Sequence, residues 1–161
     1  MFDPTAFDNM KVVAEGLFYD LDLNGTITIK ERNDIIDLAQ LSRRYSLSFM
    51  LNEHSDVLAT FRLYAHLQQL SAELLSEGGP AKRGAFLEIV YSGSDRDITQ
   101  EKIREWQVAW GEQRKFETRE INSSLFGTSI ELVVRFERLI TEEMMEDLQK
   151  LIEFFVATLQ R

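Results

Sequence analysis

The sequence predicts an α+β fold, in which a largely antiparallel sheet of about six strands begins with an N-terminal β-hairpin and is accompanied by three longer helices. Three observations predict it. The chain has 161 residues, 44% of them hydrophobic, which is enough for one core and a single domain, residues 1–161. Several segments alternate apolar and polar residues as half-buried strands do. Other segments repeat apolar residues at helical spacing.

The segment from Asp20 to Glu31 fits two structures that exclude each other. It matches the ligand positions of an EF-hand calcium loop, with a glycine at the sharp turn. The matching ligands are Asp20, Asp22, Asn24, Thr28 and Glu31. The same segment also fits a β-hairpin, in which a loop at 23–25 sets Leu21 opposite Ile27. Polar side chains then share the other face of the hairpin.

The flanking residues favour the hairpin. An EF-hand needs a helix before its loop, but Gly16 lies in that segment, where a glycine costs about 1 kcal/mol relative to alanine. Val12, Val13 and Phe18 suit a strand better than a helix. Arg32 stands where EF-hands normally have an apolar residue. The hairpin is therefore the prediction, and a calcium- or small-ligand-binding regulatory protein that uses Asp20 to Glu31 is the alternative.

A short helix, a strand and a long helix are expected next. Asparagine and aspartate near the start of residues 33–43 are suitable caps for a short helix. Residues 45–51 alternate between apolar and polar, which predicts a strand. Ser55 is a suitable N-cap for a helix running to about residue 76, whose apolar surface is broader than one sheet face can cover.

The second half of the chain predicts three more strands and a helix. Residues 85–91 are an apolar run that ends at a Ser-Gly-Ser loop, and a helix follows over 97–113 with both tryptophans on the stripe facing the sheet. Residues 116–122 and 129–136 predict two strands joined by a glycine-containing turn.

The terminal helix, which Thr141 is expected to cap, carries an unusually large apolar set. Its members are Met144, Met145, Leu148, Leu151, Ile152, Phe154, Phe155, Val156 and Leu159. This set is wider than packing on one sheet would bury. We therefore expect self-association, most simply a homodimer whose interface includes residues 144–159, and a further protein partner is compatible with it.

Composition excludes several classes of function. With 18 basic and 27 acidic residues, the formal net charge is −9, which disfavours binding to nucleic acid or to an anionic membrane surface. The absence of cysteine excludes disulfides, thiolate catalysis and cysteine-ligated metals. No apolar run is long enough to span a bilayer, and the N-terminus lacks the pattern of a secretory signal. A cytoplasmic location is therefore expected.

The sequence assigns no catalytic, cofactor-binding or metal-binding residue and implies no cofactor. His54 and His66 each have an ordinary structural explanation, and the loop at 92–94 lacks a phosphate-binding fingerprint. The acidic run is typical of a solvated helix start; it comprises Glu142, Glu143, Glu146 and Asp147. The prediction is a non-catalytic cytosolic protein that acts by protein interaction, in a cellular role that the sequence does not identify.

Overall fold

The computed structural model describes residues 5–53, 56–74 and 83–160. In chain order the elements are α1 (Thr5–Leu23), β1 (Ile27–Asp37), β2 (Ser42–Leu51), β3 (Leu58–Ala65), α2 (Leu67–Leu74), β4 (Ala85–Ser94), α3 (Gln100–Trp110), β5 (Lys115–Ser123), β6 (Gly127–Ile140), a 3-10 turn (Glu142–Met144) and α4 (Met145–Leu159).

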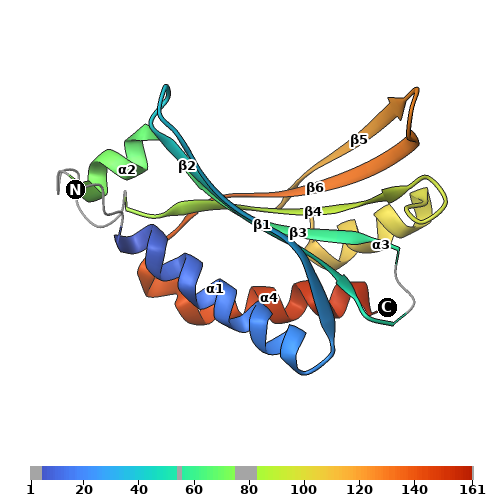
Figure 1. The fold of residues 1–161 in the computed structure, drawn as a ribbon, viewed down its shortest axis with the longest axis horizontal. Coiled ribbons are helices and arrows are strands. Elements are labelled where there is room, and N and C mark those ends of the chain that lie inside the picture. The colour runs from blue at the N-terminus through green and yellow to red at the C-terminus, as the bar shows by residue number, and fades with distance from the viewer. Residues whose placement is uncertain (1–4, 54–55, 75–82, 161) are drawn as a thin grey trace.

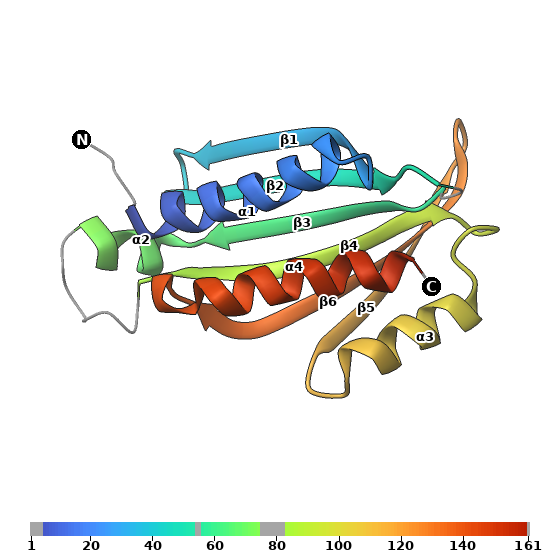
Figure 2. The same cartoon turned by 90° about the horizontal axis from the view of Figure 1, so that it is seen from below.

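The predicted fold class is confirmed. The strands form one six-stranded sheet in the order β1-β2-β3-β4-β6-β5, and every neighbouring pair is antiparallel. Helices α1 and α4 lie side by side on one face of this sheet (Figures 1 and 2). Strands β1 and β5 form its two edges. A helix, and not a hairpin, precedes the first strand.

The predicted hairpin around residues 19–29 is wrong, because residues 5–23 form helix α1. Phe7, Met10, Ala14 and Phe18 are all fully buried, and their spacing of three and four residues places them on one helical stripe. Tertiary packing of this stripe outweighs the weak helix propensity of the neighbouring β-branched residues. The N-terminal hairpin of the sheet is instead β1–β2.

Gly16 lies on the exposed side of α1, and a Cβ added there would meet no atom within 4 Å. We expect Gly16→Ala to raise the free energy of unfolding by about 1 kcal/mol, because alanine has less backbone freedom to lose. Urea denaturation measures the change. Gly25→Ala is the contrasting variant, since Gly25 has φ +83° and should lose stability when replaced. A loss of stability at Gly16 would contradict the helix.

Two further segments differ from the prediction. The expected short helix at 33–43 is the end of β1, the turn of the β1–β2 hairpin and the start of β2. In this turn the Asp37 carboxylate accepts hydrogen bonds from the backbone amides of Ala39 (2.9 Å) and Gln40 (3.1 Å). The expected helix at 55–76 is strand β3 followed by the much shorter α2. Ser55, its expected cap, and residues 75–76 lie outside the described residues.

The remaining elements are confirmed. The expected strands at 45–51, 85–91, 116–122 and 129–136 are β2, β4, β5 and β6. Helix α3 begins after Thr99, whose side chain accepts a hydrogen bond from the Lys102 amide at 3.2 Å. Of the two tryptophans, Trp106 is buried and Trp110 is half-buried. Thr141 is not the expected cap of the terminal helix: its side chain makes no capping hydrogen bond, and a 3-10 turn separates it from α4, which begins at Met145.

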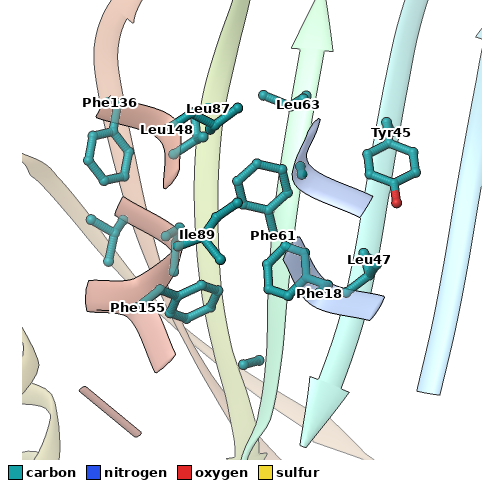
Figure 3. Close-up of a cluster of buried hydrophobic side chains, with 14 of the residues drawn as sticks. Phe18, Tyr45, Leu47, Phe61, Leu63, Leu87, Ile89, Phe136, Leu148 and Phe155 are labelled. Atoms are coloured by element: carbon teal, nitrogen blue, oxygen red, sulfur yellow. The ribbon is translucent and has the colours of Figure 1, made fainter. Parts of the chain in front are cut away.

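The core lies between the sheet and the pair α1 and α4 (Figure 3). Phe18 from α1 packs between Phe49 and Phe61, at ring-centroid distances of 5.1 and 5.4 Å, and Phe155 from α4 contacts Phe49 at 5.3 Å. Every apolar residue of α4 is buried or half-buried within the chain. The apolar surplus that predicts a homodimer is therefore covered by the sheet, by α1 and by Trp110.

Candidate functional site

The face of the sheet opposite α1 and α4 is concave, because the β1–β2 and β5–β6 hairpins both rise from it away from those helices (Figure 1). We call this surface the concave face. It consists of the residues that alternate with the core residues along each strand. Among them are Arg44, Ser46, Ser48, Thr60, Arg62, Tyr64, Glu88, Val90, Glu131, Val133, Arg135, Glu117 and Arg119.

A chain of alternating ion pairs crosses the concave face. Strand register places Arg62 opposite Glu88 and Glu88 opposite Arg135. The Glu88 carboxylate lies 3.4 Å from the Arg62 guanidinium and 3.9 Å from that of Arg135. The Glu117 carboxylate lies 2.7 Å from the guanidinium groups of both Arg135 and Arg119. The hydrogen bonds from Arg119 and then Arg135 lower the pKa of Glu117 to about 2. The Glu131 carboxylate, 3.9 Å from the Arg119 guanidinium, is the last member of this row of ion pairs.

The two valines of this face are nearly inaccessible. Val133 is 1% exposed and Val90 is 5% exposed, and the two are paired across β4 and β6. Glu88 and Arg135 form the neighbouring pair of these strands on the same face. The aliphatic parts of such long side chains cover apolar surface while their charged ends stay near water.

A pocket of about 360 Å³ lies on the concave face beside the β1–β2 hairpin. Its lining residues are Ile35, Asp37, Gln40, Ser42, Arg43, Arg44, Arg62, Tyr64, Ala65, His66 and Glu88. Most of the lining therefore comes from three neighbouring strands, and His66 comes from the junction between β3 and α2. Burial raises the pKa of the Tyr64 hydroxyl, so this side chain is neutral at physiological pH and able to donate.

The tips of both hairpins carry exposed apolar side chains. In the β1–β2 tip these are Ile35, Ile36, Leu38 and Leu41, of which Leu38 is 81% exposed. In the β5–β6 tip they are Ile121, Leu125 and Phe126, of which Phe126 is 91% exposed. Leu41 has φ 52°, in the left-handed region that leucine rarely adopts. Exposed groups of large apolar residues mark interaction surfaces.

The Asp20 to Glu31 segment is a helix-to-strand turn. Helix α1 extends through Leu23, so the incoming helix of an EF-hand is present, but β1 stands in place of the outgoing helix. The Asp22 carboxylate accepts from the Ile29 amide at 2.9 Å, and the Asn24 side-chain oxygen accepts from the Thr26 amide at 3.0 Å. Within the described ranges, no three histidine, aspartate or glutamate side chains gather so that they could hold a metal ion.

The histidines and the serine loop show no catalytic arrangement. His66 is exposed and makes an edge contact with Tyr64, while His54 lies outside the described residues. Residues 92–94 are not the expected loop but the end of β4, and the amides that follow them are used in a turn: Asp97 and Ile98 both donate to the Ser94 carbonyl. The acidic run at 142–147 is exposed, as predicted for a solvated helix start.

Arg43 and Arg44 are adjacent in sequence but lie on opposite faces of β2. Arg43 is 8% exposed and bonds Asp34 in a bidentate manner, at 2.9 and 2.8 Å, and Asp8 at 2.8 Å. Its hydrogen bonds, with a smaller effect from Lys11, lower the pKa of Asp34 to about 2 against the opposing effect of burial. Arg44 instead lies on the concave face and lines the pocket.

Sequence reasoning missed the two central residues of the pocket, Arg62 and Tyr64, because it placed them on a helix. The signal was present: Ala59, Phe61 and Leu63 alternate with polar residues, and all three are fully buried.

Comparisons with known proteins identify no family for this chain. No protein-family model matches the chain, and no curated protein or solved structure matches it. Among the described helices, none has both the length and the apolar character needed to cross a membrane.

Proposed function

We propose that this chain is a non-catalytic, homo-oligomeric interaction protein that associates through the tips of its β1–β2 and β5–β6 hairpins. The observation that carries the proposal is the set of large apolar residues exposed at both tips, on the same side of the sheet (Figure 1). Leu125 and Phe126 are 83% and 91% exposed, so neither contributes to the core. Burying them in an interface removes apolar surface from water.

The backbone at Leu41 supports the same surface. A residue with a Cβ costs about 1 to 2 kcal/mol in the left-handed region. Leu41 is 49% exposed, so burial within the chain offsets only part of that cost. Strain of this kind is concentrated at functional positions. A role for the leucine side chain in contact with a partner accounts for its presence at this turn.

The charge distribution favours a second copy as the partner. The chain as a whole has a formal charge of −9, which opposes self-association. The ion-pair chain of the concave face, however, contains three arginines and three glutamates, so its formal charges cancel. A twofold arrangement that brings concave faces toward each other therefore brings together ion-pair networks without net charge and places both tips of each copy at the interface.

Sedimentation equilibrium tests this proposal. We expect the wild-type chain to sediment as a dimer at micromolar concentration, and the double variant Leu125→Asp with Phe126→Asp to sediment as a monomer. Because both side chains are exposed, the double variant should keep the wild-type circular dichroism spectrum. Val108→Asp is the matched control, since Val108 is 82% exposed but lies on α3. A wild-type monomer, or a double variant that remains dimeric, refutes the proposal.

A further inference from the structure

We propose that the pocket beside the β1–β2 hairpin binds a small organic molecule through an oxyanion group, either a carboxylate or a phosphate monoester. The site goes beyond the proposed function, because it takes a small molecule and not a protein. It rests on an imbalance in the pocket, where, among the described residues, several hydrogen-bond donors have no partner while both acidic residues of the lining already have one.

The donors come from four side chains. In the part of the chain that the structure describes, the Arg44 guanidinium has no ion pair, and the Tyr64 hydroxyl and His66 ring have no hydrogen bond. Arg62 makes one long contact with Glu88, 3.4 Å, and its Nε is shielded from solvent without a partner among the described residues. A buried donor left unpaired costs about 1 to 3 kcal/mol, so it requires an explanation.

Both acidic residues of the pocket already have partners. Glu88 is shared between Arg62 and Arg135, and the Asp37 carboxylate accepts from two amides in the hairpin turn. Arg43, the third arginine of the lining, is neutralised by Asp34 and Asp8 on the other face. The Arg44 and Arg62 guanidinium groups can only donate, so a ligand that pairs with them must supply acceptors.

The strand register holds the two available arginines together. Arg44 lies opposite Tyr64, and Arg62 lies two residues before Tyr64 on the same strand and the same face. Arg44 and Arg62 are thus diagonal neighbours, a spacing that long side chains reach across. Two guanidinium groups at this spacing repel each other unless an anion lies between them. Their planar donor geometry matches the oxygens of carboxylate and phosphate.

The size and the apolar lining define the rest of the ligand. A volume of about 360 Å³ lies at the lower end of the range for small-molecule sites, so an anion with a small organic body fits it. Ile35 and the Tyr64 ring supply apolar surface beside the charged groups. Tyr64 is itself fixed by stacking on Phe86, with ring centroids 5.6 Å apart. The binding surface is therefore held on paired strands.

Titration of the ¹⁵N-labelled chain, followed by amide chemical shifts, tests the site. The probes are phenyl phosphate, benzoate and, as the uncharged match, benzyl alcohol. We expect at least one anion to give saturable shifts centred on residues 35–44 and 62–66 at low-millimolar concentration, and benzyl alcohol to give none. Tighter binding of phenyl phosphate assigns the ligand to phosphate monoesters, and tighter binding of benzoate assigns it to carboxylates.

Variants decide whether the arginines carry the binding. Arg44→Gln and Arg62→Gln should each weaken the affinity at least about tenfold. Arg138→Gln, an exposed arginine that does not line the pocket, should leave it unchanged. If Arg62→Gln fails to fold, Arg44→Gln decides alone, because Arg44 is exposed. The proposal is refuted if neither anion saturates, if benzyl alcohol binds equally well, or if the arginine variants bind as the wild type does.

Discussion

Replacing Phe155 with alanine is expected to lower the free energy of unfolding by about 3 to 5 kcal/mol. The ring is fully buried and contacts Phe49 at 5.3 Å and Tyr91 at 5.4 Å, so its removal leaves a cavity at the centre of the core. Helix α4 cannot move inward to fill the cavity without disturbing its packing against α1. Urea denaturation at one fixed protein concentration measures the loss.

Phe154→Ala is the control for this prediction. Phe154 is the neighbouring residue on α4, but it is only half-buried and makes an edge contact with Trp110 at 4.8 Å. Its replacement should cost clearly less than that of Phe155. Equal losses would contradict the position of Phe155 in the core. Because Phe155 is fully buried, a substitution there acts on the fold, so its variants do not test self-association through residues 144–159.

Arg43→Ala should cost about 2 to 3 kcal/mol at neutral pH. The variant loses charge-assisted hydrogen bonds to Asp34 and Asp8, and it loses the contact of the guanidinium with the Phe7 ring, 4.6 Å from its centroid. The two aspartates are left near each other without their shared cation. Because both are partly exposed, solvent reduces the penalty below that of a fully buried pair. Arg138→Ala, an exposed arginine without an ion pair among the described residues, should change stability little.

The difference in stability between the wild type and Arg43→Ala should depend on pH in a defined direction. The pKa of Asp34 is about 2 in the folded chain, below its ordinary value of 3.8, so its contribution to stability is present above pH 4 and is lost as pH falls toward 2. In Arg43→Ala this pKa returns toward the ordinary value. The stability gap between wild type and variant should therefore shrink between pH 4 and pH 2. A gap that stays constant over this range would show that Arg43 acts by packing alone.

The strands that alternate cleanly could be predicted from the sequence, and the places where two periodicities overlap could not. In β6, Leu132, Val134 and Phe136 face the helices and leave one interpretation. In β3, Leu58, Phe61 and Ala65 also have helical spacing, so a strand was interpreted as part of a helix. Only pairing with β2 and β4 decides between the two, and pairing is not a local property.

At the N-terminus, local propensity and periodicity point to different structures. Gly16 and the neighbouring β-branched residues favour a hairpin, whereas the buried stripe that includes Phe7 and Phe18 has helical spacing. Gly16 is tolerated because its side of α1 faces solvent and needs no side chain. The pocket was beyond prediction for a different reason. Arg44 and Arg62 meet only through the register of two strands, one of which the sequence placed in a helix.

The strand order also constrains how the chain folds. All neighbouring strands except β4 and β6 are consecutive in sequence, so most of the sheet can assemble by local hairpin closure, which is fast. Helix α4, however, follows all six strands and covers the core side together with α1. Until α4 packs, part of the apolar side of the sheet therefore stays uncovered. A folding chain in which α4 has not yet docked is accordingly prone to aggregation.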